Sequence, residues 1–223
     1  MTEKYPRPAV TVDVVIVALR DNELHVLLIK RETEPYRGKW ALPGGFVNID
    51  EALDAAARRK LAEETGVSHV YLEQLYTFGE LDRDPRGRVI SIAYIALVPT
   101  PLAVHGGSDT GDAQWWPLNA MPLLAFDHSD IVQYAVTRLR YKIEYSAVGF
   151  RLMPPEFTLS ELQKAYEIVL GEPLDKRNFR RRIMEAKVIE PLDEIRTGEG
   201  RPARLYRFRP DAVSEVKARR LFP

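Results

Sequence analysis

Hydrophobic residues in the first hundred positions gather in four short segments that are rich in β-branched side chains: 11–19, 24–31, 70–81 and 88–99. Turn-forming residues separate the members of each pair, namely Arg20, Asp21 and Asn22 in the first pair and the Pro- and Gly-containing stretch 82–87 in the second. Short apolar runs divided by such turns are typical of β-strands. We therefore predict two β-hairpins.

Two further segments show helical periodicity. Residues 52–65 are almost all good helix formers, and they end at Gly66, a residue type that often terminates helices. Farther along, Ser129 or Asp130 is expected to cap an amphipathic helix whose apolar residues recur at i+4, namely Ile131, Ala135, Leu139 and Ile143. The segment 146–158, which contains two consecutive prolines, is predicted to be a linker.

The last seventy or so residues predict a winged helix-turn-helix. Thr158 and Glu161 form a capping-box pattern that opens a first helix, and Asp175 can cap a second. The inward-facing residues of the second helix are expected to be Phe179, Ile183 and Ala186. The segments 188–196 and 203–209 then form a hairpin around a Gly-rich tip, and this hairpin is the predicted wing.

The second helix and the hairpin carry many cations, which suits binding to the phosphates and base edges of double-stranded DNA. The predicted DNA-binding residues of the helix are Lys176, Arg177, Asn178, Arg180, Arg181 and Arg182. Those of the hairpin are Arg196, Arg201 and Arg204. A charged helix beside a charged hairpin is also compatible with a solvated surface, and RNA or protein is the alternative partner.

The net charge of zero hides an asymmetry along the chain. Residues 1–150 carry 16 Lys and Arg against 20 Asp and Glu, whereas residues 151–223 carry 16 against 12. We therefore expect two domains with different partners, one of residues 1–147 and one of residues 148–223. The chain has no cysteine, no apolar signal core at its N-terminus and no uncharged apolar stretch of about 18 residues. A cytoplasmic protein that does not bind membranes is expected.

The run from Gly45 to Val67 carries residues spaced for metal and phosphate chemistry, with one exception. Pro43, Gly44 and Gly45 form a loop able to approach a phosphate closely. On the helix, positions 60, 63 and 64 share one face, and carboxylates at all three would suit magnesium bound to a diphosphate. Position 60 is a lysine, and at about 4 Å and a dielectric of about 20 its repulsion of a divalent ion is worth about 8 kcal/mol. A solvated charged face is the alternative interpretation.

The same run resembles the signature of the Nudix hydrolases, G-x5-E-x7-R-E-U-x-E-E-x-G-U, in which U is a bulky aliphatic residue. The matching positions are Gly45, Glu51, Arg59, Leu61, Glu63, Glu64, Gly66 and Val67. The resemblance implies an α/β/α sandwich with a mixed sheet. Because Lys60 replaces a glutamate of the family, we expect that the pocket is kept, that hydrolysis is lost and that no residue is catalytic. The alternative is an active magnesium-dependent ADP-ribose pyrophosphatase in which Glu63, Glu64 and either Glu51 or Glu80 hold the metal.

A Nudix domain with an altered signature followed by a winged helix is similar to the NrtR family of Nudix-related transcriptional regulators. The segments YRGKWALPGGFVN, LAFDHSDI and LDKRNFRRRI carry this resemblance. It implies a homodimeric regulator, usually a repressor, that binds a DNA operator near NAD biosynthesis or salvage genes. It also implies that the Nudix domain senses ADP-ribose or a related nucleotide. No cofactor is expected to be required, with magnesium relevant only to residual hydrolysis.

The effector pocket is expected beside the Nudix helix. The residues assigned to it are Arg37 for a phosphate, Trp40 and Tyr94 for stacking, and Glu51, Glu63 and Glu64, together with Lys60, for hydroxyl groups or a residual cation. Phe126 and His128, from a segment similar to that of the family, are expected at its rim. Core packing is the alternative role for Trp40 and Tyr94. Arg59 is expected to orient Glu51 through a salt bridge, the role that the resemblance implies.

Overall fold

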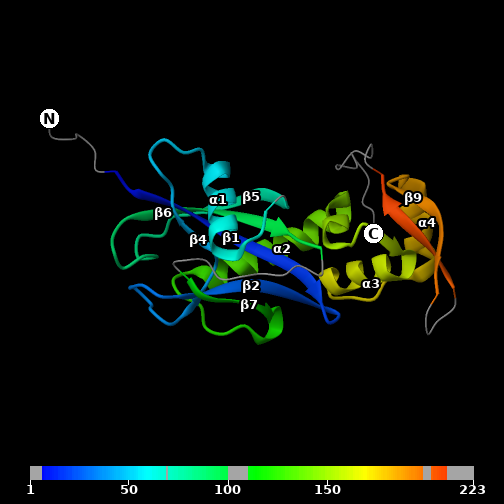
Figure 1. The fold of residues 1–223 in the computed structure, drawn as a ribbon, viewed down its shortest axis with the longest axis horizontal. Helices are drawn as coiled ribbons and strands as arrows, with labels where there is room; N and C mark the ends of the chain where they lie inside the picture. The colour runs from blue at the N-terminus through cyan, green and yellow to red at the C-terminus, as the bar shows by residue number, and fades with distance from the viewer. Residues whose placement is uncertain (1–6, 69, 100–109, 198–201, 210–223) are drawn as a thin grey trace. The chain divides into compact units, whose positions relative to one another are not determined.

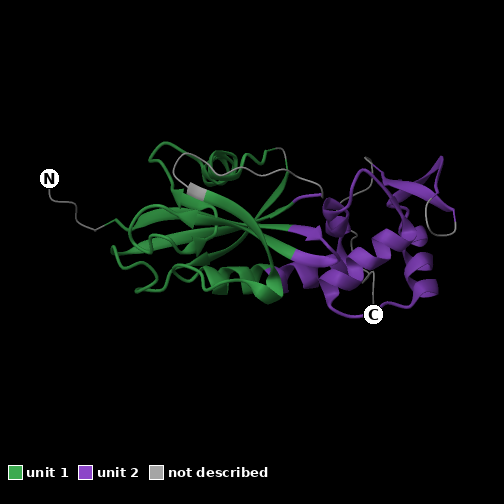
Figure 2. Cartoon of the chain, turned by 60° about the horizontal axis from the view of Figure 1, so that its bottom comes forward, with its two compact units in different colours: residues 1–17, 25–97, 102–135 green, residues 18–24, 98–101, 136–223 purple. Residues whose placement is uncertain are grey.

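The computed structural model describes residues 7–68, 70–99, 110–197 and 202–209. These residues group into two compact units (Figure 2). Unit 1 contains the described residues within 1–17, 25–97 and 102–135, and unit 2 those within 18–24, 98–101 and 136–223. Over the described ranges, no helix combines the length and the apolar character that crossing a membrane requires.

Unit 1 is built on a seven-stranded mixed sheet (Figure 1). Its strands are β1 (Ala9–Arg20), β2 (Glu23–Arg31), β3 (Trp40–Ala41), β4 (Gly44–Phe46), β5 (Tyr71–Phe78), β6 (Val89–Leu97) and β7 (Thr110–Pro117). The central order is β3-β2-β1-β6-β5, with β4 paired to β1 and β7 paired to β2. Strands β1 and β6 run parallel, whereas β4 and β5 run antiparallel to their partners. The mixed sheet expected from the sequence is therefore confirmed.

Both predicted hairpins are present. Strands β1 and β2 are hydrogen-bonded neighbours joined through Asp21 and Asn22, whose φ angles of 49° and 62° lie in the left-handed region. A two-residue hairpin turn requires that conformation, and Asp and Asn tolerate it. Strands β5 and β6 pair antiparallel. The side chains from Val14 to Val17 are fully buried on both faces of β1, which explains the unbroken apolar run.

The two predicted helices of this region also form. Helix α1 (Leu53–Thr65) ends where Gly66 adopts a left-handed φ of 71° and donates its amide hydrogen to the carbonyl of Ala62. Helix α2 (His128–Tyr145) buries all four of the predicted apolar residues. The predicted caps are wrong, because the carbonyl of Asp127 already accepts from the amides of Asp130 and Ile131. The helix therefore begins before Ser129.

Helices cover both faces of the sheet, which confirms the α/β/α layering. On one face, the Tyr94 hydroxyl of β6 donates to Asp54 of α1 over 2.8 Å. On the other face, Tyr76 and Phe78 of β5 contact Tyr134 of α2. Tyr76 pairs with the residue that precedes Tyr94 on β6, and successive strand residues point to opposite faces.

Along one of its edges, β1 pairs with two different strands, β4 and β2. The opposite edge pairs continuously with β6 from Ala9 to Val17. On the edge that β4 and β2 share, β4 pairs with Thr11, Val12 and Asp13. Strand β2 pairs with the part of β1 that is nearer the hairpin turn. Thr11 and Asp13 therefore lie where β4 and β2 part from each other.

Unit 2 contains the predicted winged helix. Its elements are η2 (Ala147–Leu152), β8 (Glu156–Thr158), α3 (Leu159–Leu170), α4 (Lys176–Ala186), β9 (Ile189–Arg196) and β10 (Ala203–Phe208). The capping box of α3 is complete, because Thr158 and Glu161 exchange hydrogen bonds of 2.7 and 3.2 Å. Asp175 caps α4 by accepting from the amide of Asn178 over 2.8 Å. These local signals confirm the positions at which both helices begin.

Residues 146–158 do not form the predicted linker. Residues 147–152 form a 3-10 helix whose Phe150 ring packs against Phe157 and Phe208, and β8 adds a third strand to the wing. The prediction gave weight to Pro154 and Pro155 and overlooked the apolar residues around them, which are buried in the core of unit 2. The predicted domain boundary after residue 147 stays a prediction.

The sequence pattern also failed to reveal three strands of unit 1. Strands β3 and β4 are two and three residues long, too short to show an alternation. Strand β7 contains Gly and Asp and lacks an alternating pattern, yet it pairs with β2 along most of its length. Tertiary pairing with a buried neighbour, rather than local propensity, determines these strands.

Candidate functional site

A cavity of about 250 Å³ lies in unit 1 beside the point where β4 and β2 part. Strands β1, β2 and β4, helix α1, the turn before β6 and the start of α2 all contribute residues to its wall. Its charged residues are Asp13, Arg31, Glu32, Lys60, Glu64, Arg83, Asp84 and Arg86. The other lining residues are Thr11, Ile29, Thr33, Leu42, Gly44, Gly45, Phe46, Phe126 and His128.

Glu51, just before α1, is held by Arg59. The Nε and Nη2 atoms of Arg59 donate to the two carboxylate oxygens of Glu51 over 2.7 and 2.6 Å. These hydrogen bonds lower the pKa of Glu51 to about 2. The expected salt bridge is present, and it occupies both oxygens of Glu51.

Lys60 contacts both remaining acids of the helix face. Its Nζ lies 3.2 Å from Oε2 of Glu63 and 3.9 Å from Oε1 of Glu64. A Cβ atom at Gly45 would lie 2.7 Å from Cε of Lys60, so the end of the lysine side chain packs directly against this glycine of β4. Positions 60, 63 and 64 share a face as expected, and Lys60 provides that face with a cation.

Glu64 is the most buried of these acids, and 8% of the residue is exposed. Its Oε2 accepts a hydrogen bond of 2.9 Å from the amide of Gly44 on β4. Burial raises the pKa of Glu64 to about 7, although the Gly44 amide and Lys60 act in the opposite direction.

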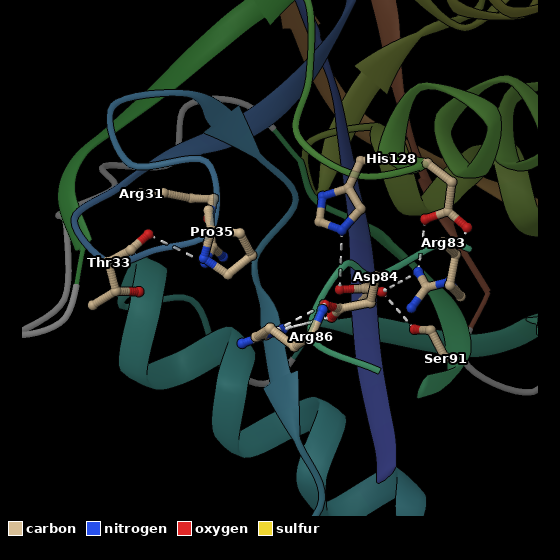
Figure 3. Close-up of polar contacts among 10 residues, drawn as sticks. Arg31, Thr33, Pro35, Arg83, Asp84, Arg86, Ser91 and His128 are labelled. Atoms are coloured by element: carbon tan, nitrogen blue, oxygen red, sulfur yellow. Dashed lines mark hydrogen bonds and ion pairs between the residues drawn. The ribbon is translucent and has the colours of Figure 1, made fainter. Parts of the chain in front are cut away.

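Two residues that line the cavity, Asp13 and His128, are buried, and His128 is labelled in Figure 3. The amide of Leu42 donates to Nδ1 of His128 over 2.9 Å, so this nitrogen carries no proton. Burial lowers the pKa of His128, which favours the neutral ring with its proton on Nε2. That nitrogen lies 3.6 Å from Oδ1 of Asp13, and the other carboxylate oxygen, Oδ2, accepts a hydrogen bond from the Ser91 hydroxyl. The ring is therefore fixed by β1, the β3–β4 segment and α2.

Two arginines of the turn before β6 are already paired. Arg83 donates to both oxygens of Asp127 over 2.9 and 2.7 Å. Arg86 donates to both oxygens of Asp84, and these two residues are labelled in Figure 3. Bidentate pairs of this kind hold the guanidinium groups in place. Their charges are largely compensated within the protein.

Arg31 lacks such a partner. Its Nε and Nη2 donate only to the backbone carbonyls of Pro35 and Thr33, and no carboxylate of the described residues lies within ion-pair distance of it. Its guanidinium lies 4.9 Å from the centre of the Phe126 ring, and that of Arg86 lies 5.6 Å from the same ring.

Burial and the nearby Arg86 lower the pKa of Arg31. Asp84, Glu64 and Asp13 act on Arg31 in the opposite direction from beyond ion-pair distance. Two neighbouring cations, one of them without an ion-pair partner among the described residues, suit an anionic ligand.

The structure brings four of the nine nominated effector residues to this cavity: Lys60, Glu64, Phe126 and His128. The other five do not line it. Tyr94 is fully buried with its hydroxyl bound to α1, and Trp40 packs against Trp116 with ring centres 5.5 Å apart, so their alternative packing role is the one observed. Glu51 and Glu63 pair with Arg59, and Arg37 is exposed outside the cavity.

The sequence interpretation missed Arg31, Arg83, Arg86 and Asp13. Arg31 ends a predicted strand, and the two other arginines lie in a turn that was judged only by its Pro and Gly content. A signal existed, since charged residues at the ends of strands beside a phosphate-binding loop suit an anion site. Thr11 adds a hydroxyl that is buried against the cavity without a hydrogen-bond partner in the described part of the chain.

No group of three His, Asp or Glu side chains among the described residues is arranged to hold a metal ion. The residual metal candidates, Glu63 and Glu64, instead share the ammonium of Lys60.

The nominated DNA-binding residues of α4 fall into two groups. Lys176, Arg177 and Arg181 are exposed, whereas Asn178, Arg180 and Arg182 are half-buried. Arg180 reaches Ser160 of α3 over 3.4 Å, and the Asn178 amide oxygen accepts from Arg181 and Arg182.

In the wing, Arg204 is exposed, and Arg196 forms an ion pair with Glu161 of α3 over 2.5 Å. Arg201 lies outside the described residues. The exposed cations of α4 and Arg204 are therefore better placed to meet a phosphate than Arg180 or Arg196 are.

These features define the class: a Nudix domain followed by a winged helix. Family models agree, since the NUDIX domain matches residues 10–135 and the NrtR DNA-binding winged helix domain matches residues 149–208. The ADPR responsive transcriptional repressor NtrR of Acinetobacter baylyi is 45% identical over 208 residues, which are 92% of this chain and 83% of that protein. The chain belongs to the NrtR family of Nudix-related regulators.

Other relatives cover the whole chain or the Nudix part. Shewanella oneidensis NrtR complexed with a 27mer DNA is 39% identical with a TM-score of 0.83, covering 95% of this chain and 98% of that one. Its NUDIX domain complexed with ADP ribose is 39% identical with a TM-score of 0.57, covering 62% and 93%. An ADP-ribose pyrophosphatase of Methanocaldococcus jannaschii is 43% identical over 129 residues, covering 58% of this chain and 73% of that protein.

Replacing Lys60 by glutamate is expected to create a metal site. The change removes the ammonium beside Glu63 and Glu64 and adds a third carboxylate to the face, so magnesium affinity should rise by a factor of about ten or more. Isothermal titration with magnesium measures it, and Lys60→Gln, which removes the charge without adding a ligand, should give a smaller increase. Equal affinities for the wild type and Lys60→Glu would refute the charge argument.

Glu64 is expected to make the stability of unit 1 depend on pH. Folding raises its pKa from the ordinary 4.5 to about 7, so between these values the native state binds more proton and stability falls as pH rises. The wild type should lose about 3 kcal/mol over this window relative to Glu64→Gln. Urea unfolding followed by tryptophan fluorescence tests this, because Trp40, Trp115 and Trp116 all lie in unit 1.

The matched control is Glu63→Gln, because the Glu63 side chain is 49% exposed on the same helix face. This variant should keep the pH dependence of the wild type. Parallel curves for the wild type and Glu64→Gln would show that Glu64 does not titrate in this range.

Proposed function

We propose that this protein is a DNA-binding transcriptional repressor of NAD biosynthesis or salvage genes, and that the cavity of unit 1 binds ADP-ribose without hydrolysing it. The observation that carries the proposal is the Lys60 ammonium, which lies beside two acids of the Nudix helix. It lines a cavity that also contains Arg31, which forms no ion pair among the described residues. Similarity to an ADPR responsive repressor over most of the chain supports it.

The cavity suits a diphosphate joined to sugars. Arg31 and Lys60 supply positive charge for the phosphate oxygens, and Arg31 can offer them two parallel N–H groups. The unpartnered Thr11 hydroxyl and the Glu64 carboxyl can bind hydroxyl groups of a ribose. With cations supplied by the protein itself, binding requires no metal cofactor.

Hydrolysis of the diphosphate would need a metal ion and a carboxylate that acts as a base. Glu63 and Glu64 share Lys60, and both oxygens of Glu51 are bound by Arg59. The loss of a positioned base alone costs roughly 10²- to 10⁴-fold in rate. The Nudix helix is therefore proposed to retain ligand binding without turnover.

An active ADP-ribose pyrophosphatase is the competing function. The similarity to the Methanocaldococcus jannaschii enzyme favours it, because 43% identity extends over most of the Nudix domain. Lys60 opposes it on electrostatic grounds. Measuring AMP released from ADP-ribose in the presence of magnesium separates the two functions.

In unit 2 the proposed contact with DNA is α4 in the major groove, with Arg204 on the wing near a phosphate. We propose a homodimer, since two recognition helices would then meet symmetric half-sites about one helical turn apart. ADP-ribose changes the affinity for the operator if it binds one arrangement of the dimer more tightly than another. The change in the free energy of operator binding cannot exceed that difference in ADP-ribose binding energy.

Replacing Arg31 by glutamine is expected to weaken ADP-ribose binding about 10- to 100-fold, because a charged hydrogen-bond donor to the phosphates is lost. Calorimetric titration in the presence of EDTA measures the affinity. Arg58→Gln, on the exposed side of α1, is the control of equal charge and should bind as the wild type does. Unchanged binding by Arg31→Gln, or robust AMP release by the wild type with magnesium, would contradict the proposal.

Replacing Arg181 by alanine is expected to weaken binding to the chain's own upstream DNA. If Arg181 contacts a base, the loss should be about 5- to 100-fold on the cognate site; if it contacts a phosphate, the slope of log affinity against log salt should fall by about one. Gel retardation with and without ADP-ribose at several salt concentrations measures both. Arg58→Ala should leave retardation unchanged, and equal retardation of Arg181→Ala would mean that α4 is misassigned.

A further inference from the structure

The side chain of Asn178 joins two arginines of helix α4 (Figure 1). Residues 178, 181 and 182 are related by i, i+3 and i+4, so their side chains share one face of the helix. The amide oxygen of Asn178 accepts a hydrogen bond of 2.9 Å from Nη2 of Arg181 and one of 3.2 Å from Nε of Arg182. Because an arginine can only donate, the amide must turn its oxygen toward both partners.

This arrangement occupies the one neutral acceptor that α4 could offer to a base. A carbonyl oxygen has two lone pairs, and in Asn178 both are used by arginines. The other polar side chains of residues 176–182 are those of lysine and arginine, which are donors. Glu185, the only acid of α4, follows Asn178 by about 10 Å along the helix axis. The side chains in the first two turns of α4 therefore present only donors.

Only one base matches a pair of parallel donors in the major groove. Guanine has two neighbouring acceptors there, N7 and O6, whereas adenine has an amino donor beside N7, thymine a methyl group beside its acceptor, and cytosine a donor. An asparagine reads adenine by using its oxygen and its nitrogen together. Asn178 cannot do so while its oxygen is bound by the two arginines.

Arg181 keeps the geometry that guanine requires. Its Nη2 carries two hydrogens, and each belongs to a different pair of parallel N–H groups, so the hydrogen bond to Asn178 leaves one pair complete. Arg181 is exposed, and within the described ranges its only hydrogen bond is the one to Asn178. That bond restricts a long side chain before DNA arrives, which lowers the entropic cost of binding.

We propose that Asn178 is a positioning residue that orients Arg181 toward a guanine in each half-site of the operator. Adenine is disfavoured at that position, because its 6-amino group would face an N–H group of Arg181. Asn178 acts through the arginine and makes no base contact with its own oxygen. This inference rests on the proposed placement of α4 in the major groove.

The test uses the chain's own upstream DNA, in which single guanines are replaced by 7-deazaguanine. This analogue keeps the base pair but lacks the N7 acceptor. Gel retardation of the full wild-type chain is expected to show affinity reduced about 5- to 100-fold when the guanine contacted in each half-site is replaced. Replacing adenines by unsubstituted purine, which lacks the 6-amino group, is expected to leave the affinity unchanged.

Two variants separate the positioning role from a structural one. Asn178→Ala should lose the preference for guanine over 7-deazaguanine, because Arg181 is no longer held. Its affinity for unrelated DNA should change less than about threefold, since no charge that meets a phosphate is removed. Asn178→Asp still offers oxygens to the arginines and should retain the guanine preference. The control is Asn119→Ala, at an exposed asparagine of the 3-10 helix η1 (Leu118–Ala120).

Failure of this inference differs from failure of the proposed function. If Asn178→Ala keeps the guanine preference, or Asn178→Asp loses it, Asn178 does not position Arg181. If wild-type affinity depends on the 6-amino group of an adenine, the amide of Asn178 reads adenine. If no guanine replacement matters although the operator is preferred to unrelated DNA, α4 recognises the sequence in another way. The proposed repressor stands in these three cases, whereas equal binding of the wild type to both DNAs would overturn both proposals.

Discussion

The ion pairs of Lys60 with Glu63 and Glu64 are the interaction on which the function proposed for unit 1 depends. They place a permanent cation on the one helix face of a Nudix domain that would otherwise concentrate negative charge. The fold does not need this lysine, because the core of α1 lies on other faces, where Ala56, Ala57 and Leu61 are buried. The end of the Lys60 side chain lies in the space beside Gly45, which has no side chain of its own. A change of charge at one exchangeable position can therefore alter the chemistry of the cavity while the fold is kept.

Asp13 carries the structural side of the same site. Its buried carboxylate faces Ser91 of β6, Arg83 of the turn before β6 and His128 of α2, so three segments far apart in sequence meet at one residue of β1. A buried carboxylate without partners is costly, and each of these contacts compensates part of that cost. Removing Arg83 would leave the charge of Asp13 without its ion pair, and removing Ser91 would leave a buried carboxylate oxygen without its hydrogen-bond donor. The network therefore constrains where the turn and α2 begin. The positions of Arg83 and Arg86 in the cavity follow from that constraint.

Local signals explain which parts of the fold the sequence could predict. The left-handed Asp21 and Asn22, the capping box at Thr158 and the glycine after α1 act within a few residues, and each produced a correct prediction. Strand β7 and the buried 3-10 helix at 147–152 depend on partners distant in sequence, and no local pattern shows them.

The candidate site shows the same division. The helix spacing placed Lys60 beside Glu63 and Glu64 correctly, because the geometry of one helix determines it. Tyr94 and Trp40 were assigned to stacking from residue type alone, although strand register directs Tyr94 into the core. The sequence gives no reason to prefer Arg31 over Arg37 as a phosphate-binding residue. Only the tertiary structure shows that Arg31 lines the cavity and that its hydrogen bonds go to backbone carbonyls. Whether a charged side chain has an oppositely charged neighbour depends on the tertiary structure. For that reason the sequence alone could not identify Arg31 as a residue suited to bind an anion.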